Sequence, residues 1–488
     1  MERNEAFLQK AEALKPTLHS RILTVSGREL PLKKGGRLCL DFGEHVVGYV
    51  TIQLGSVGSH PDAPVWLRLK FAEREQELSE NVEDYHGWIS ASWVQQEQIH
   101  VDVLPCELRL SRRYAFRYVQ IEVLDISGKY DLVVKGAACE AVSSADETAL
   151  LPYKPEDAFL KQIDTVACKT LHDCMQLVFE DGPKRDRRLW MGDLRLQALA
   201  NYQCYRNNDL VKRCLYLFAG STLPGGRVGA GLFLEPEVEV DDTVMFDYSL
   251  FYNPTLLDYY EATGDRETLA ELWPTAWRQI ELAQVSFDEN GLVRDSDAPG
   301  WCFVDWNLGL NKQASAQGIY LYCLRAAGKI AEILGDEEKA AWIQADYEKK
   351  KQAAIDSLYD AAQGLFVSGA ERQISWASQI WMVLGGVCGG DVLHRVENTE
   401  AVTMVTPYLY HHYVQALIDV GEKDKALQVI TDYWGGMVKE GADTFWELYD
   451  PANPNASPYG GTIVNSYCHA WSCAPAYFLR KYFALSAE

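Results

Sequence analysis

Residues 180–193 (EDGPKRDRRLWMGD) hold an unusual density of groups that could do chemistry. Four carboxylates, four basic residues and a tryptophan fall within these fourteen positions, ahead of an apolar helical pattern. Carboxylates can bind hydroxyl groups and move protons, arginines can fix their charge state, and an indole can stack on the apolar face of a sugar ring. A helix entry with a Gly-Pro turn and solvated charges would also place such residues together. The segment alone therefore leaves both interpretations open.

Three later segments also combine an acid or an imidazole with a nearby tryptophan. They are residues 299–307 (PGWCFVDWN), 441–450 (GADTFWELYD) and 465–472 (NSYCHAWS). For any one of them, a buried tryptophan beside a capping acid is the simpler explanation. Four such segments in one part of the chain favour a shared carbohydrate site, because function concentrates on loops that a rigid scaffold holds.

Composition excludes several classes of partner. The 488 residues can form two or three domains with a large core. The net charge of −23 would repel nucleic acid and anionic membranes. No stretch approaches the roughly 20 apolar residues of a membrane span, and residues 1–7 lack the apolar core of a signal peptide. We predict a cytoplasmic protein that binds neither nucleic acid nor membrane, with a homodimer as one possible assembly.

The sequence predicts no metal and no cofactor. Its twelve cysteines contain no CxxC pair and no ligand-like cluster, so we expect reduced, buried thiols without structural disulfides. Glu235, Asp241 and Asp242 form an acidic patch that fits a solvated loop. None of the acidic loops has the spacing of a known calcium loop.

The first 148 residues have the pattern of β-structure. Alternating apolar and polar residues predict strands over 65–72 and 117–124, and apolar runs predict others over 38–54 and 130–134. Short strands separated by Gly, Pro and Ser turns are typical of a β-sandwich. We therefore predict an antiparallel β-sandwich over residues 1–148.

Residues 149–488 have helical periodicity instead. Amphipathic segments are expected near 156–180, 193–219, 247–262, 267–286, 319–334, 337–358, 373–386, 407–420, 423–434 and 465–483. Gly335 can end one helix and Asp336 can begin the next. Ten to twelve helices in pairs indicate a mainly α protein in which an α/α toroid gathers its loops at one end.

On these motifs the chain resembles glycoside hydrolase family 78, the α-L-rhamnosidases, over nearly its whole length. The family motif D-C-P-x-R-E-x-x-x-W-x-G-D has the spacing of residues 181–193. The 441–450 segment is similar to the family's GATTxWE element, and residues 466–479 are similar to its CHxWxxxPxYxL element. Residues 303–306 resemble its loop with an Asp-Trp pair. Upstream, residues 40–55, 69–75 and 116–122 look like the β-sandwich that precedes the family's catalytic barrel.

The resemblance implies an (α/α)6 catalytic barrel over residues 149–488 and hydrolysis of short α-L-rhamnosides with inversion, without a cofactor. Carried over by position, the general acid is Asp186 and the general base is Glu447. The residues expected to line the rhamnose subsite are Asp181, Arg185, Trp190, Asp193, Asp305, Trp306, Trp446 and His469. The C-terminal β-domain common in the family is expected to be absent.

Two positions depart from the family motif. Gly182 replaces its cysteine, and Asp186 replaces its usual glutamate with a side chain one methylene shorter. A register with one more residue would put Arg187 at the acid position, but the ungapped register keeps Trp190 in line. A protonated acid also requires that nearby arginines not hold it as an anion. We therefore expect Arg187 and Arg188 to point outward, and Arg185 to pair with Asp181 or Asp193.

Other functions fit the sequence less well. The altered acid position would suit an enzyme of the same barrel that acts on another deoxy sugar or on a uronide-linked rhamnose. It would also suit a sugar-binding or regulatory protein that has lost catalysis. A helical scaffold for protein partners leaves the loops with acid and tryptophan unexplained.

Overall fold

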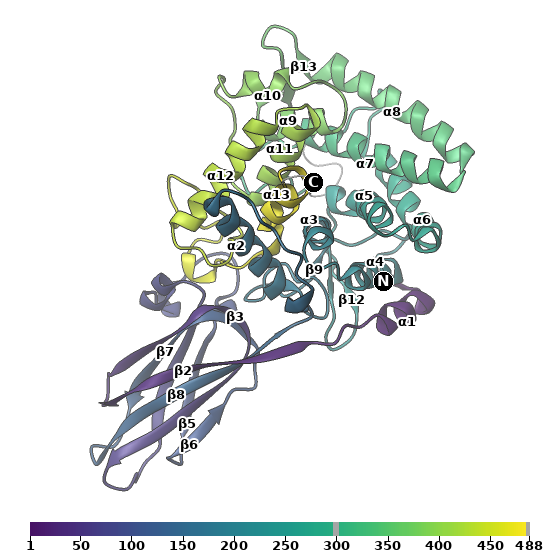
Figure 1. Ribbon diagram of the computed structural model, residues 1–488. Coiled ribbons are helices and arrows are strands. Elements are labelled where there is room, and N and C mark those ends of the chain that lie inside the picture. The colour runs from purple at the N-terminus through teal and green to yellow at the C-terminus, as the bar shows by residue number, and fades with distance from the viewer. Residues whose placement is uncertain (296–301, 485–488) are drawn as a thin grey trace.

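The computed structural model describes residues 1–295 and 302–484. An elongated sheet region projects from a larger helical region (Figure 1). Residues 299–301, part of the first predicted tryptophan loop, lie outside the described residues. Among the helices described, none is both long enough and apolar enough to cross a membrane.

Seven antiparallel strands form the sheet region, which confirms the predicted β-structure of the first part of the chain. Their order is β2 (His19–Leu32), β8 (Tyr130–Ser143), β3 (Arg37–Gly58), β7 (Tyr114–Asp125), β4 (Val65–Ala72) and β5 (Gln96–Val101), with β6 (Cys106–Arg109) also paired to β3. The four predicted strands fall within β3, β4, β7 and β8. The other three, β2, β5 and β6, were not predicted.

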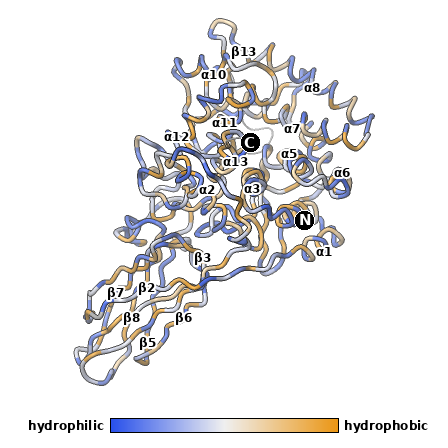
Figure 2. The backbone as a smooth tube through the Cα atoms, in the orientation of Figure 1, coloured by the Kyte–Doolittle hydropathy of each residue, from blue (hydrophilic) through white to orange (hydrophobic). Residues whose placement is uncertain are grey.

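The length of β3 explains why the hydrogen bonds give one sheet where two stacked sheets were expected. Residues 37–48 of this strand pair with β7, and residues 48–58 pair with β8. A single strand therefore joins both parts of the region. Apolar side chains from alternate positions meet in one core, and the tube in Figure 2 changes repeatedly between orange and blue along the strands.

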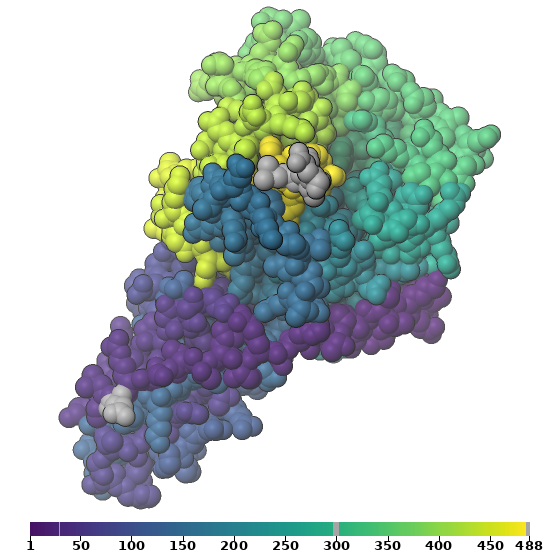
Figure 3. Space-filling model, in the orientation of Figure 1, coloured from purple at the N-terminus to yellow at the C-terminus, as the bar shows by residue number. Residues whose placement is uncertain are grey.

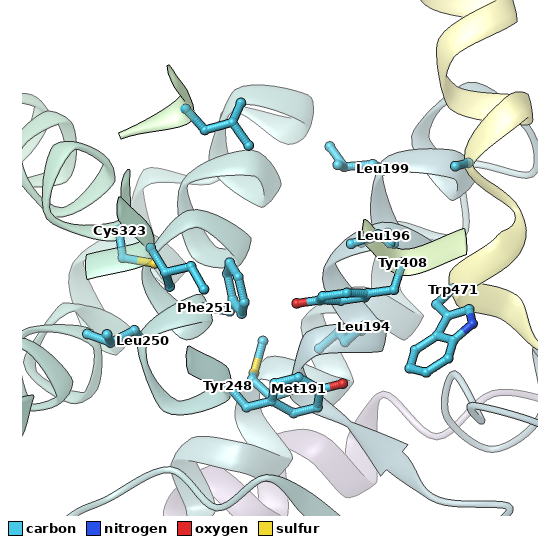
Figure 4. Close-up of a cluster of buried hydrophobic side chains, with 14 of the residues drawn as sticks. Met191, Leu194, Leu196, Leu199, Tyr248, Leu250, Phe251, Cys323, Tyr408 and Trp471 are labelled. Atoms are coloured by element: carbon cyan, nitrogen blue, oxygen red, sulfur yellow. The ribbon is translucent and has the colours of Figure 1, made fainter. Parts of the chain in front are cut away.

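Six helices form an inner series in the helical region. They are α3 (Met191–Gln203), α5 (Phe246–Thr263), α7 (Gln313–Leu334), α9 (Trp376–Leu384), α11 (Pro407–Asp419) and α13 (Ala474–Tyr482). From α3 to α11 each packs against the next, and α13 packs back on α3. Every residue of α3 from Met191 to Asn201 is buried, as expected of a helix surrounded by protein. Figure 4 shows side chains of α3, α5 and α7 meeting in this core.

The remaining helices of this region cover the inner series. They are α2 (Ala158–Cys174), α4 (Asn208–Gly220), α6 (Arg266–Ala283), α8 (Glu337–Leu358), α10 (Asp391–Val396) and α12 (Lys423–Lys439). Helix α8 buries only five of its 22 residues, so it presents a polar face to solvent. The predicted pairing of helices is confirmed, but the boundaries differ in three places. Residues 193–219 form two helices, the last helix begins at 474 rather than 465, and α10 was not predicted.

The first residues of the chain cross from the sheet region to the helical region. Strand β1 (Glu2–Arg3) pairs with β10 (Ser221–Thr222), and helix α1 (Glu5–Ala13) packs on α4. Leu8 and Ala11 belong to the helical core. In Figures 1 and 3 the purple N-terminal chain runs beneath the helices before it enters the sheet. The domain boundary between residues 148 and 149 stays a prediction. Strand β1 and helix α1 belong to the first predicted domain but contact the helical region.

One segment of the sheet region lies against the loops that precede α13. We call residues 73–95, between β4 and β5, the 73–95 segment. Its Glu73 accepts a hydrogen bond from the Tyr467 amide at 2.6 Å, and its Glu80 accepts one from the Ile463 amide at 3.1 Å. Side chains of the 73–95 segment therefore hold loops of the helical region in place.

Candidate active site

A cavity of about 470 Å³ opens between the loops of the helical region and the 73–95 segment. Its volume suits a small ligand. Eight of the ten predicted site residues line it, namely Asp181, Arg185, Asp186, Trp190, Asp193, Trp306, Glu447 and His469. Segments far apart in the chain thus form one site.

The loop before α3 is closed by the carboxylate of Asp181. The amide of Arg188 donates to its Oδ1 at 3.0 Å, and the amide of Asp186 lies 3.5 Å from its Oδ2. Strand β9 (Leu189–Trp190) then pairs with β11 (Gly231–Phe233). These contacts hold Asp186 at the cavity and Trp190 at the start of α3.

Asp186 and Glu447 share one arginine. The Nη2 of Arg185 donates to Oε2 of Glu447, and its Nη1 lies 3.7 Å from Oδ1 of Asp186. The backbone of Glu447 is fixed by Ser466, whose carbonyl accepts its amide at 3.0 Å, and by Trp471, whose indole donates to its carbonyl at 2.9 Å. Both carboxyl groups therefore line one cavity and contact different nitrogens of one guanidinium.

The predicted pairing of Arg185 with Asp181 or Asp193 is wrong. Loop amides occupy the Asp181 carboxylate, as described above. The Nε of Arg185 donates to the carbonyl of Val464 at 3.1 Å, and the ring of Tyr459 lies 4.1 Å from its guanidinium carbon. These contacts direct the arginine toward Glu447.

The two carboxyl groups differ in environment. Burial raises the pKa of Asp186, and the opposing effect of the arginines Arg185 and Arg188 does not cancel this rise. Glu447 instead accepts hydrogen bonds at both oxygens, from Arg185 and from the hydroxyl of Tyr459. The cavity therefore holds two carboxyl groups in different environments, which is the arrangement that acid and base roles require.

A second acidic pair forms the floor of the cavity. Burial raises the pKa of Asp181 and of Asp193 well above the ordinary value, and nearby carboxylates raise both further. His469 lies between them, with Nε2 3.8 Å from Asp181 and Nδ1 3.8 Å from Asp193. Burial lowers the pKa of His469 well below its usual range, so its ring is neutral. Neutral groups that both donate and accept suit the hydroxyls of a sugar.

The two arginines that follow Asp186 take different directions. Arg187 turns toward the sheet region, where its Nη2 lies 3.4 Å from Oε1 of Gln95. It does point away from the cavity, but into protein rather than solvent, and burial lowers its pKa to about 10. Arg188 lines the cavity and pairs with Asp241 at 2.9 Å, so its predicted outward direction is wrong. Asp241 is buried rather than part of a solvated loop, because it holds this arginine.

Asp305 lies outside the lining of the cavity, which corrects its predicted place in the subsite. Its carboxylate accepts the amide of Val405 at 2.9 Å, the hydroxyl of Thr406 at 2.5 Å and the amide of Trp306 at 3.0 Å. Thr406 is the N-cap of α11. Asp305 therefore ties the loop of Trp306 to this helix.

Trp446 is also absent from the cavity lining, although its neighbour Glu447 is there. Its ring packs against the guanidinium of Arg74 at 4.1 Å and against Tyr467 at 5.5 Å. The side chain of Trp446 therefore lies against the 73–95 segment, whereas that of Glu447 lines the cavity. Trp446 thus anchors the loop of Glu447 to the 73–95 segment.

Several lining residues were not predicted from the sequence. Trp88, Ile89 and Trp93 come from the 73–95 segment, and Tyr248, Tyr459 and Trp471 come from the helical region. Tyr248 donates to Asp193 at 3.3 Å, and Figure 4 shows Tyr248 and Trp471 beside the helical core. Trp471 stood in a predicted segment, but Trp88 and Tyr459 carry no pattern that marks them.

The structure also brings His45, Asp173 and Cys468 together, with possible ligand atoms within 4.8 Å of one another. The ring nitrogens of His45 lie 2.7 Å from Asp173 and 3.1 Å from Glu73. Lys169 is 2.7 Å from both carboxylate oxygens of Asp173. A lysine ammonium thus already supplies the positive charge that a metal ion would bring, so these residues do not fit a metal centre.

Known proteins match the chain over nearly its whole length. Residues 10–141 match the glycosyl hydrolase family 78 α-rhamnosidase N-terminal domain, and residues 153–483 match the bacterial α-L-rhamnosidase six-hairpin glycosidase domain. A rhamnosidase from Klebsiella oxytoca with rhamnose bound is 47% identical, with a TM-score of 0.95 and 99% of each chain covered. The separate comparison with curated proteins found no match.

Larger relatives share the fold. A family 78 rhamnosidase from Bacillus sp. GL1 is 21% identical, with a TM-score of 0.78, over 93% of this chain and 47% of its own. An α-L-rhamnosidase from Streptomyces avermitilis is 17% identical, with a TM-score of 0.68, over 96% of this chain and 44% of its own.

The helical region and its acidic cavity define a six-hairpin glycosidase that carries an antiparallel sheet region before it. The matched domains and the 47% identity then specify the family. The chain belongs to glycoside hydrolase family 78, the α-L-rhamnosidases.

Proposed function

We propose that this glycosidase hydrolyses terminal α-L-rhamnosides with inversion, with Asp186 as the general acid and Glu447 as the general base. The observation that carries the proposal is that both carboxyl groups line one cavity and contact the same guanidinium, that of Arg185. The bound rhamnose in the 47% identical relative supports the choice of sugar.

The chemistry follows from the two environments. Asp186 gives its proton to the glycosidic oxygen as the bond to the anomeric carbon breaks. Glu447 takes a proton from a water that attacks the opposite face of the sugar, which requires the two carboxyl groups to be roughly 6.5–9.5 Å apart. Each oxygen of Glu447 accepts one donor in the protein, so lone pairs remain for that water.

The packing of the two regions supports further parts of the proposal. We infer an (α/α)6 barrel over residues 149–488, because α3 to α13 form a series that returns to its start and each has an outer partner. We infer a β-sandwich over residues 1–148 in which the long strand β3 belongs to both layers, because the apolar side chains of both parts share one core. Short rhamnosides suit the cavity because the 73–95 segment covers one side of it. Cytoplasmic location and a homodimer stay predictions.

The test uses two variants with a control. Glu447→Gln should bind an aryl α-L-rhamnoside but lower kcat by about 10² or more, because the amide cannot accept the proton of water. Asp186→Asn should lose most activity on alkyl rhamnosides and little on an activated aryl rhamnoside, whose leaving group needs no proton. Glu440→Gln changes an exposed acid near the same loop and should leave both rates unchanged.

The anomer released first, followed by NMR, reports the stereochemistry, and β-L-rhamnose is the expected product. A panel of other aryl glycosides checks the sugar. Unchanged turnover in Glu447→Gln, or equal losses on both substrates in Asp186→Asn, would refute the assigned roles. Initial release of the α-anomer would refute inversion.

A further inference from the structure

We propose that the three apolar side chains of the 73–95 segment at the cavity, Trp88, Ile89 and Trp93, bind the aglycone of the substrate and favour a planar aromatic one. We call these three side chains the aromatic wall. The proposal rests on the proposed function, because it names the second half of the rhamnoside that the cavity would cleave.

The cavity lining changes character from its floor to its mouth. The side chains of Asp193, Asp181 and Glu447 are only 3–6% exposed. Trp88 is 67% exposed, which is unusual for so large an apolar residue. A polar floor and an apolar, accessible rim therefore offer two different subsites in one cavity.

The indole of Trp88 is held in place although it is exposed. Its Nε1 donates to the carbonyl of Pro458 at 2.8 Å. Its ring centroid lies 5.6 Å from that of Tyr459 and 6.4 Å from that of Trp306. A ring fixed by a hydrogen bond and two aromatic neighbours can bind a ligand with little loss of conformational entropy.

Tyr459 connects this ring to the reacting groups. Its hydroxyl donates to Glu447, and its ring contacts both Arg185 and Trp88. Tyr459 therefore lies between the aromatic wall and the proposed base, and contacts both.

The leaving group of a bound rhamnoside must extend from the proposed acid toward the open side of the cavity. The side chain of Asp186 is 20% exposed, more than the acids of the floor, so it is the carboxyl group closest to solvent. A sugar held on the floor would direct its aglycone past Asp186 to the rim. The aromatic wall belongs to that rim.

The chemistry of the wall favours an aromatic ring over a second sugar. A sugar subsite needs several donors and acceptors for hydroxyl groups, whereas the wall offers two indoles and the aliphatic side chain of Ile89, with Ser90 as a polar neighbour. Aromatic pairs gain free energy from offset or edge-to-face contact in addition to apolar burial. A phenolic aglycone is the chemical class that fits.

The experiment compares two substrates in wild-type enzyme and in Trp88→Ala. Phenyl α-L-rhamnoside presents an aromatic ring to the wall, and methyl α-L-rhamnoside presents almost nothing. Trp88→Ala should lower kcat/KM about tenfold for the phenyl substrate and less than about twofold for the methyl substrate. Comparing each substrate with itself in wild type cancels the different reactivity of the two leaving groups. Trp88→Phe should keep most of the preference.

The matched control is Trp66→Ala. Trp66 is another partly exposed tryptophan of the sheet region, and its ring centroid lies 5.3 Å from that of His100. It does not line the cavity. The Trp66→Ala substitution should change neither rate. Binding is measured separately by calorimetry with the Glu447→Gln variant, which removes the chemistry. In that variant, adding Trp88→Ala should weaken the binding of phenyl α-L-rhamnoside about tenfold and leave the binding of methyl α-L-rhamnoside unchanged.

Three results would overturn the inference. Equal losses on both substrates in Trp88→Ala would give the indole a role in shaping the cavity only. A larger loss on a rhamnosyl-glucose disaccharide than on the phenyl substrate would make the wall a sugar subsite. A wild-type enzyme that cleaves neither rhamnoside would refute the proposed function itself, and the aglycone site with it.

Discussion

Lys184 gives the sharpest test of how the sheet region supports the active site. Its side chain is 1% exposed, and its Nζ bonds Oε2 of Glu77 and donates to the carbonyl of Asn465 at 2.9 Å. Glu77 belongs to the 73–95 segment, whereas Lys184 directly precedes Arg185. We predict that Lys184→Met strongly destabilises the folded protein, because it leaves the carboxylate of Glu77 buried without its cation.

The magnitude follows from burial of both partners. Glu77 is 3% exposed, and burial raises its pKa to about 7 even with Lys184 beside it. Removing one partner of such a pair costs about 3–5 kcal/mol. A solvent-exposed pair contributes less than about 1 kcal/mol. Lys10→Met, which breaks the exposed pair with Glu271, is therefore the matched control.

The assay measures the free energy of unfolding in urea at pH 8 and at pH 5.5. Because the folded-state pKa of Glu77 lies above its ordinary value of 4.5, protonation favours the folded state, and this contribution disappears as the pH rises through about 7. The cost of Lys184→Met should therefore be larger at pH 8 than at pH 5.5, where Glu77 can take up a proton.

A second variant makes the reasoning refutable even if the first unfolds. Glu77 also accepts the amides of Glu73 at 3.1 Å and Arg74 at 2.9 Å through Oε1, and glutamine keeps that acceptor. The double variant Lys184→Met/Glu77→Gln should be more stable than Lys184→Met alone at pH 8. If the double variant is less stable, or if the Lys184→Met cost does not vary with pH, the uncompensated carboxylate is not the cause.

Three further predictions address individual residues. Asp305→Asn should lower stability by about 1–3 kcal/mol with little change in kcat, since it weakens hydrogen bonds to α11 rather than contacts in the cavity, and thermal unfolding with kinetics checks both. Trp446→Phe should leave KM for a rhamnoside unchanged, and a raised KM would return this residue to the subsite. Arg188→Met should raise the pKa of Asp186, because a positive charge that favours its anion is lost. The alkaline limb of the kcat/KM profile should then move to higher pH, and a shift to lower pH would contradict the acid role.

Much of the site could be predicted because its residues stand close together in the sequence. Asp181, Arg185 and Asp186 belong to one loop, and the spacing to Trp190 and Asp193 identifies that loop before any fold is known. Helix positions were also recoverable where apolar residues recur at helical spacing, as at Ile319, Cys323 and Ile330 of α7, which are all buried.

The sequence pattern could not predict the direction in which each side chain points. An acid beside a tryptophan occurs at Asp305 and again at Glu447, yet the first bonds the start of α11 and the second lines the cavity. The partner of Arg185 is 262 residues away. Sequence spacing gives which residues share a loop, but tertiary packing decides where each one points.

Contributions from the sheet region were the hardest to foresee. Trp88 stands between Gly87 and Ile89, and no periodicity marks it. It reaches the cavity only because Trp88 and Tyr85 bond the carbonyls of Pro458 and Tyr459, which follow α12. Hydrogen bonds between positions 370 or more residues apart leave no local signal.

Arg185 contacts both proposed catalytic groups. It donates a hydrogen bond to Glu447, and its positive charge opposes the rise in the pKa of Asp186, whose Oδ1 lies 3.7 Å from its Nη1. Burial outweighs that opposition, so the pKa of Asp186 is raised although Arg185 lies beside it. Under the proposed mechanism, this rise supports Asp186 as the acid, although its side chain is one methylene shorter than the glutamate of the family motif.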